Sequence, residues 1–165
     1  MGYYDEIASG YEELHEEEQG KKIKFIQEHF SVASDEKLLD VGCGTGLTTE
    51  PWNCIRYGAE PAPKLLERAR SKDSITYVEA AAEKLPFSNG FFDVVISITA
   101  IQNYADIEKG LSEIKRVGKE RFVLTFLKKS AKKDLIDGLI RGMFEVSEVL
   151  EEEKDMVYIV EKANI

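Results

Sequence analysis

The apolar positions along the chain follow two spacings, one typical of helices and the other of buried strands. The first 30 residues predict helix, because their apolar positions recur at helical spacing. These positions are Ile7, Tyr11 and Leu14 and, after the polar stretch HEEEQG, Ile23, Ile26 and Phe30. The run KLLDVGCGTG follows, and Leu38, Leu39 and Val41 form a short apolar stretch within it. Such a stretch is typical of a strand that is buried on both faces.

The rest of the chain alternates strands with helices. Apolar or β-branched runs predict strands near residues 54–59, 75–80, 91–100 and 121–127. Amphipathic patterns predict helices over residues 63–72, 107–117 and 131–144, and Gly118 is suited to end the second of them. In the last helix we expect Leu135, Leu139 and Ile140 to face inward. Two further strands, near residues 144–150 and 156–162, follow without a helix between them.

Strands that alternate with helices predict a parallel sheet with helices on both faces. The last two strands, joined by the acidic turn EEEKD, are expected to form an antiparallel hairpin at the sheet edge. We therefore predict an α/β fold, a Rossmann-like, doubly wound, mostly parallel seven-stranded sheet with a C-terminal antiparallel hairpin. The 165 residues fit one domain, with an N-terminal helical lid over residues 1–35 and a Rossmann-like core over residues 36–165.

Composition and charge narrow the classes of partner. The chain carries 31 acidic and 22 basic residues, so it lacks the overall basic character typical of nucleic-acid-binding proteins. It has no apolar run long enough to cross a membrane, and its acidic N-terminus lacks the apolar core of a signal peptide. Cys43 and Cys54 are too few for a disulfide framework or a cysteine zinc site. We expect a cytoplasmic protein that binds neither a membrane nor a metal.

The glycine turn DVGCGTG, residues 40–46, is the strongest chemical signal. It follows a predicted buried strand and is expected to open a helix through Leu47, Thr48 and Thr49. Glycines there permit positive φ and let a ligand approach the backbone. The dinucleotide pattern G-x-G-x-x-G and the phosphate-binding pattern with Lys after the last glycine are both absent, so phosphate is not the obvious ligand. A plain strand-to-helix turn is the structural alternative.

Glu60 is the second signal, because it ends the second predicted strand twenty residues after Asp40. A carboxylate at that place is positioned to accept hydrogen bonds from both ribose hydroxyls of a nucleoside. Before Pro61 and Pro63, the same residue also suits the start of a helix. Its distance from the glycine turn favours the ribose interpretation.

A third block, AAEKLPF at residues 81–87, follows the third predicted strand and leads through the turn SNG into FFDVV. Together with LLDVGCGTG, this order of blocks resembles the class I S-adenosylmethionine-dependent methyltransferases, in particular the small domains called methyltransferase type 11. The resemblance runs from about Lys37 to Val117. It implies S-adenosylmethionine as the cofactor, S-adenosylhomocysteine as the product and methyl transfer as the activity.

The resemblance also implies roles for individual residues. Glu60 would bind the ribose, the backbone of Ala82 the adenine, and the glycine turn the methionine part of the cofactor. The turn residues are Gly42, Gly44 and Gly46, with Asp40 beneath them. Further cofactor contacts are expected from Tyr11 or Tyr4 on the lid and from Cys43, Pro61, Glu83 and Thr99. Where the family often has Asp, this chain has Ala81, so either Glu79 or Glu83 compensates or adenine is held less tightly.

The methyl acceptor is expected after the fourth strand, where Asn103 and Tyr104 are candidates for positioning it. The block ISITAIQNY is similar to that of enzymes that methylate ring nitrogens of guanine in RNA, and it lacks the Pro-Pro pattern of amino-methylating enzymes. Asn103 and Tyr104 suit hydrogen bonds to a base or stacking on it. A polar helix start is the structural alternative for the same residues.

Three functional interpretations stay open. In the first, the chain modifies RNA, and the lysines after the fifth strand bind phosphates rather than form a solvated helix start. These are Lys128, Lys129, Lys132 and Lys133. In the second, it methylates a small molecule, which its acidic surface favours. In the third, it is a cofactor-binding subunit that needs a small activating protein for activity.

Overall fold

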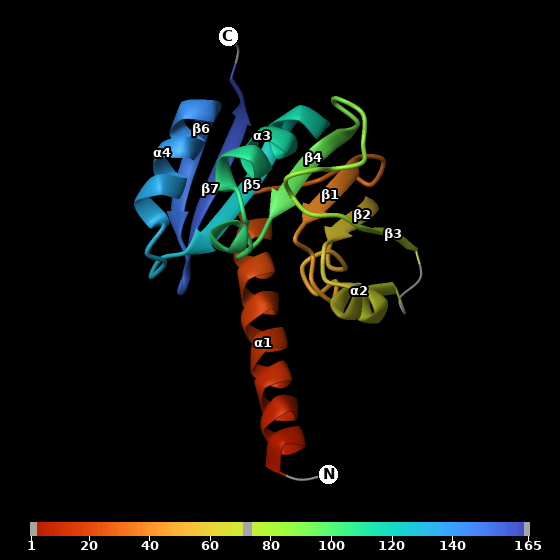
Figure 1. Cartoon of the computed structure of the whole chain (residues 1–165). Helices are drawn as coiled ribbons and strands as arrows, with labels where there is room; N and C mark the ends of the chain where they lie inside the picture. Colours follow the sequence, from red (N-terminus) through yellow and green to blue (C-terminus); the bar gives the residue numbers. More distant parts are fainter. Residues whose placement is uncertain (1–2, 71–73, 164–165) are drawn as a thin grey trace.

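The computed structural model describes residues 3–70 and 74–163, with side chains described from residue 13 onward. Over these residues, seven strands form one sheet with helices on both of its faces (Figure 1). The strands are β1 (Lys37–Val41), β2 (Ile55–Glu60), β3 (Ile75–Glu79), β4 (Phe92–Ser97), β5 (Gly118–Leu127), β6 (Phe144–Glu151) and β7 (Asp155–Lys162). The helices are α1 (Tyr3–Gln27), α2 (Pro63–Arg70), the short 3₁₀ helix η1 (Ile101–Asn103), α3 (Ile107–Val117) and α4 (Lys133–Met143).

The strands lie in the order β3-β2-β1-β4-β5-β7-β6. The pairs from β3 through β5 are parallel, whereas β7 runs antiparallel to both β5 and β6. The predicted fold class is therefore confirmed, including the C-terminal hairpin. The order reverses at β1, whose neighbours β2 and β4 lie on opposite sides, and ligands of open α/β sheets bind at such a point.

Alternation along the strands divides the core between the two faces of the sheet. Leu39 and Val41 of β1 belong to the larger apolar cluster, which α3 and α4 cover. Leu38 of β1 belongs to a second cluster, which the C-terminal turns of α1 cover through Ile23 and Ile26. The helix α2 completes this second face, where its buried residues pack against β3. Both faces of β1 are therefore buried from solvent, as its apolar sequence predicts.

The helix α1 is a single helix of 25 residues that continues through the polar stretch HEEEQG. Its N-terminal turns run away from the sheet, while its C-terminal turns lie against it (Figure 1). Most residues of the polar stretch are exposed, so their polarity marks the solvent face of a continuous helix and not a break. None of the helices in the described part of the chain is both long and apolar enough to cross a lipid bilayer.

Two local predictions were wrong. The helix expected after the glycine turn is replaced by successive turns over residues 44–51. Pro51 disfavours helical backbone at the preceding residue, and the hydroxyls of Thr48 and Thr49 hydrogen-bond back to Asp40. In α4, Leu135 is exposed, whereas Ile136 and Ile140 take the buried positions and Leu139 is half-buried. Only the inward position of Leu135 was therefore wrong, whereas Ile140 lies in the core and Leu139 packs against it, as predicted.

Candidate functional site

A cavity of about 520 Å³ opens at the carboxyl edge of the sheet, above β1, β2 and β4. Its lining comes from the glycine turn, from α1, and from the segments that follow β2, β3 and β4, which include Leu65 of α2 and Asn103 of η1. The lining residues are His15, Gln19, Gly42, Cys43, Gly44, Thr45, Leu47, Thr48, Glu60, Pro61, Leu65, Ala81, Ala82, Glu83, Ile98, Thr99, Ala100, Asn103, Tyr104 and Ala105. A volume of this size accommodates a ligand as large as a nucleoside with a side chain.

The glycine turn forms the wall of this cavity nearest β1. Gly42, Gly44 and Gly46 all have positive φ, at 76°, 56° and 90°. The backbone N–H of Gly42 donates to the carbonyl of Ala59 at 2.8 Å, which fastens the turn to β2. A Cβ added at Gly42 would lie 2.7 Å from the Cβ of Ala100, so the turn also touches the segment after β4. Only glycine satisfies both the backbone angle and this close approach.

Glu60 lies at the end of β2, buried and facing the cavity. Its Oε1 accepts a hydrogen bond from the backbone N–H of Gly44 at 2.9 Å, and its Oε2 accepts one from the N–H of Ala62, also at 2.9 Å. The side chain therefore fixes the glycine turn as well as the start of α2. A carboxylate has about four acceptor positions, so each oxygen retains one for a ligand hydroxyl.

Asp40 is fully buried beneath the glycine turn and does not line the cavity. Its Oδ2 accepts hydrogen bonds from the hydroxyls of Thr48 at 2.6 Å and Thr49 at 2.8 Å. Burial is the largest effect on this carboxyl and raises its pKa to about 6, and the two threonine hydrogen bonds only partly oppose the shift. Asp40 therefore holds the segment after the turn in place at an electrostatic cost.

This raised pKa predicts a pH dependence of stability. The pKa of Asp40 is higher in the folded state than its ordinary value near 4, so the ionised carboxylate destabilises the fold, fully so above about pH 6. This penalty disappears as the pH falls from about 6 toward 4 and the carboxyl takes up its proton. Relative to Asp40→Asn, the wild type should gain about 2 kcal/mol of unfolding free energy between pH 7 and pH 4. Denaturant titrations of both proteins at several pH values measure this difference, and a constant difference would refute the raised pKa.

Asn103 and Tyr104, the two residues proposed to position the acceptor, differ in their exposure and in their hydrogen bonds. Asn103 ends η1 and is exposed at the mouth of the cavity. Tyr104 also lines the cavity, but its hydroxyl points inward and lies 2.6 Å from Ser97 Oγ, whose own hydroxyl donates to the carbonyl of Val41. Burial raises the pKa of the Tyr104 phenol, so this hydroxyl stays protonated. The ring of Tyr104 is therefore available to a ligand, whereas its hydroxyl is engaged in the core.

The cavity brings together most of the residues predicted from sequence. Those on its lining are Gly42, Cys43, Gly44, Glu60, Pro61, Ala82, Glu83, Thr99, Asn103 and Tyr104. Asp40 and Gly46 lie behind the lining, and the side chains of Tyr4 and Tyr11 lie outside the described residues. Glu83 uses Oε2 to accept from the N–H of Asp106, and Glu79 is exposed away from the cavity.

Sequence reasoning missed the contribution of α1 through Gln19. This residue is buried, lines the cavity, and its Oε1 has no hydrogen-bond partner among the described residues. A buried amide oxygen without a partner is uncommon and is typical of a site that awaits a ligand or water. Within the same described residues, no group of three or more His, Cys, Asp and Glu side chains is arranged to bind a metal ion.

The described geometry agrees with comparisons to known proteins. Residues 39–126 match the methyltransferase domain family. An uncharacterized protein of Methanocaldococcus jannaschii, MJ1252, is 28% identical over 87% of this chain and 57% of its own length. The demethylmenaquinone methyltransferase of Thermus thermophilus is 36% identical over 50% of this chain and 42% of its own length. The chain thus spans about half the length of these relatives.

Solved structures agree on the fold. A chain from the complex between the Haloferax volcanii Trm112 methyltransferase activator and a methyltransferase superposes with a TM-score of 0.78 at 15% identity, over 95% of this chain and 96% of that one. The family match covers more than half of the chain and spans the glycine turn, Glu60 and β4, all of which contribute to the cavity or to the strands beneath it. The chain belongs to the class I S-adenosylmethionine-dependent methyltransferases.

Proposed function

We propose that this chain transfers a methyl group from S-adenosylmethionine to a small, largely apolar acceptor held beside Asn103. The structural feature that carries this proposal is a second hollow of about 390 Å³, which shares Tyr104 and Ala105 with the cofactor cavity. Leu135 and Leu139 of α4 form its apolar side together with Ile107, whereas Asp106, Glu108 and Lys132 contribute charged groups, and Leu135 is 55% exposed. An exposed leucine next to the methyl-transfer site is suited to contact the apolar part of an acceptor.

Two further observations favour a small molecule. The Thermus thermophilus relative is named a demethylmenaquinone methyltransferase, so a protein with a similar core acts on a quinone. The net charge of −9 opposes binding to the phosphate backbone of RNA. Of the four lysines after β5, Lys128 pairs with Glu151 and Lys132 donates to the carbonyl of Gln102. Because two of the four lysines already have partners within the protein, the lysines are less suited to bind phosphates.

In this proposal each part of the cofactor lies against a different element of the cavity wall. We propose that Glu60 binds the ribose hydroxyls, that the glycine turn faces the methionine part and that the backbone at Ala82 meets the adenine. Pro61 and, from the short helix α2, Leu65 supply apolar surface on the adenine side. We also propose that residues 1–35 act as a lid on the core formed by residues 36–165, since α1 contributes His15 and Gln19 to the cavity wall.

The chemistry asks little of the protein beyond positioning. When bound, S-adenosylmethionine supplies a methyl group already activated by its sulfonium. The cavity residues then have to orient that methyl group toward the acceptor and exclude water, which together account for most of the barrier reduction in such a displacement. An acceptor that keeps a proton at neutral pH also needs a base.

An activating protein partner is a second candidate feature. The Haloferax volcanii structure shows a chain of this fold in a complex that contains a methyltransferase activator. We propose that, if the isolated chain binds cofactor but transfers no methyl group, such a partner is required.

Incubation of the purified chain with labelled S-adenosylmethionine and a cell extract tests the proposal. Label in the organic-solvent-extractable small-molecule fraction is the expected result, and Leu135→Asp should reduce it. Label in nuclease-sensitive material would overturn the small-molecule assignment in favour of RNA. Cofactor binding without any label would point to the missing activator.

A further inference from the structure

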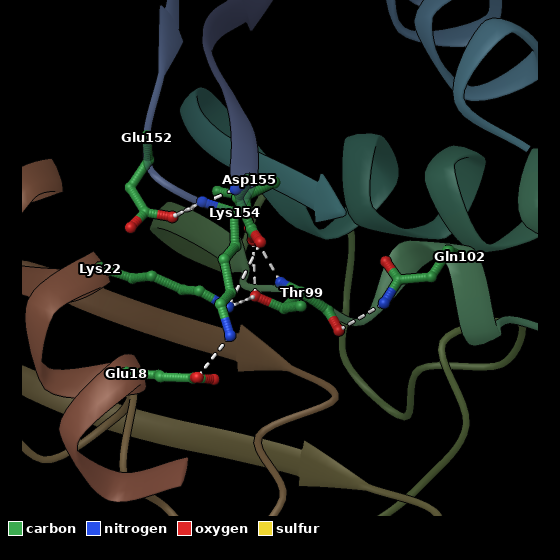
Figure 2. A network of polar contacts seen from close by, with 8 residues as sticks. Glu18, Lys22, Thr99, Gln102, Glu152, Lys154 and Asp155 are labelled. Atoms are coloured by element: carbon green, nitrogen blue, oxygen red, sulfur yellow. Dashed lines mark hydrogen bonds and ion pairs between the residues drawn. The ribbon is translucent and has the colours of Figure 1, made fainter. Parts of the chain in front are cut away.

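A buried polar network connects α1, the segment after β4 and the β6–β7 turn (Figure 2). Lys22 Nζ donates to Thr99 Oγ1 at 3.0 Å and lies 3.3 Å from Asp155 Oδ1. The side chains of Lys22 and Asp155 are 5% and 1% exposed. Within the turn that carries Asp155, the Glu152 side chain accepts hydrogen bonds from the backbone N–H groups of Lys154 and Asp155. A buried ion pair in a fixed turn therefore anchors α1 to the sheet.

Thr99, at the centre of this network, has a backbone conformation that its residue type disfavours. Its φ is 54°, in the left-handed region, where the Cβ of any residue other than glycine crowds the backbone. All of its polar groups are engaged. The N–H donates to Thr125 Oγ1 at 2.8 Å, the hydroxyl donates to Asp155 Oδ2 at 2.6 Å, and the carbonyl accepts from Gln102 Nε2 at 2.9 Å. Strained backbone persists only where its surroundings hold it in this way.

This strained turn lies in the wall of the cofactor cavity. Thr99 and Ala100 both line the cavity, and Ala100 is the residue whose Cβ approaches Gly42 of the glycine turn. On α1, Gln19 precedes Lys22 by one helical turn, so both lie on the same face of the helix. Gln19 is buried and lines the cavity with its unpartnered Oε1. Lys22 thus joins α1 to Thr99 directly by a hydrogen bond and also through Asp155, which accepts from the Thr99 hydroxyl.

We propose that Lys22 and Asp155 are positioning residues for methyl transfer. Their ion pair locks Thr99 in its left-handed conformation and holds Gln19 of α1 against the cavity, so that the ligand meets a preformed wall. Gln19 Oε1 then accepts a hydrogen bond from an N–H or O–H group of the bound ligand. This inference rests on the proposed function, because it takes the cavity to be the S-adenosylmethionine site.

Replacement of both charges tests the proposal without leaving one of them buried and unpaired. In Lys22→Met/Asp155→Leu, apolar side chains take the place of the ion pair, a change that folded proteins tolerate. Calorimetric titration with S-adenosylmethionine should show at least fivefold weaker binding, at a temperature where circular dichroism shows the variant to be folded. A fivefold loss corresponds to about 1 kcal/mol of binding free energy.

Thr99→Gly provides a rescue that a merely structural role would not predict. Glycine adopts positive φ without strain, so the turn no longer depends on the ion pair. Added to Lys22→Met/Asp155→Leu, it should restore most of the lost affinity. Lys154→Ala is the matched control, because Lys154 joins the same turn to Glu18 of α1 by a more exposed pair that does not reach Thr99. Its affinity should equal that of the wild type.

The outcomes separate this inference from the proposed function. A folded double variant that binds S-adenosylmethionine as tightly as the wild type would overturn the positioning role, as would a loss that Thr99→Gly does not restore. If the double variant does not fold, Thr125→Val serves as a second test. It removes the hydroxyl that accepts a hydrogen bond from the Thr99 N–H, so it should also weaken S-adenosylmethionine binding. Wild-type affinity of folded Thr125→Val would then overturn the role. A wild type that does not bind S-adenosylmethionine contradicts the proposed function instead.

Discussion

Gly42→Ala is expected to lower the unfolding free energy by about 2–5 kcal/mol and the rate of methyl transfer about a hundredfold. The stability loss combines left-handed backbone at φ 76° with a clash of the new methyl against Ala100 Cβ, 2.7 Å away. To relieve the clash, the glycine turn has to move away from the segment after β4. A displacement of about 1 Å between reacting groups is enough to cost roughly a hundredfold in rate.

Gly44→Ala is the matched comparison for stability. It has a similar φ of 56°, but nothing lies within 4 Å of the added Cβ. We expect it to cost only the backbone term of about 1–2 kcal/mol. Denaturant unfolding of the three proteins measures both losses. Equal losses for the two variants would show that the contact between the glycine turn and Ala100 does not constrain the site.

Glu60→Ala is expected to weaken S-adenosylmethionine binding by about 1–3 kcal/mol, which corresponds to roughly 5–150-fold in the dissociation constant. The variant removes the acceptor that we assign to the ribose hydroxyls. It also leaves the N–H of Gly44 without its 2.9 Å partner, so the glycine turn loses one of its links to the end of β2. Calorimetric titration with S-adenosylmethionine measures the change in affinity.

Glu79→Ala is the control for this change. Glu79 ends β3 and is aligned with Glu60 in the register of the two strands, but it is exposed and does not line the cavity. Its removal should leave the affinity unchanged. If Glu60→Ala also bound the cofactor with wild-type affinity, the ribose role of Glu60 would be wrong, and its carboxylate would serve only the turn and the start of α2.

The fold was predictable because its signals are local. Apolar runs that end in glycine or Pro, separated by amphipathic segments, are sufficient to predict a parallel sheet with a terminal hairpin. The absence of a helix after the glycine turn could not be predicted from such local signals. The threonines there pair with Asp40, and that pairing becomes visible only once β1 and the following turns are placed. In α4, Leu135 and Ile136 are both apolar, so the pattern alone could not decide which of them faces the core.

Some residues of the candidate site could likewise be predicted from the sequence, and others could not. The glycine turn and Glu60 lie at spacings that a nucleoside imposes on any such sheet, so the sequence could predict them. Lys22 and Asp155 act through contacts with Thr99 across 77 and 56 residues of chain. No spacing rule links a lysine in an N-terminal helix to an aspartate in a C-terminal hairpin. Their role emerges only from the three-dimensional packing of α1 against the sheet.

The most direct test of the central claim, that this cavity binds S-adenosylmethionine, is the thermal unfolding of the wild type with and without the cofactor. At about 100 times its dissociation constant, a ligand that binds only the folded state adds roughly 2.7 kcal/mol of stability. We therefore predict a clear rise in Tm with S-adenosylmethionine, and a smaller rise for Glu60→Ala at the same concentration. A wild-type Tm that does not move at saturating cofactor would contradict the account.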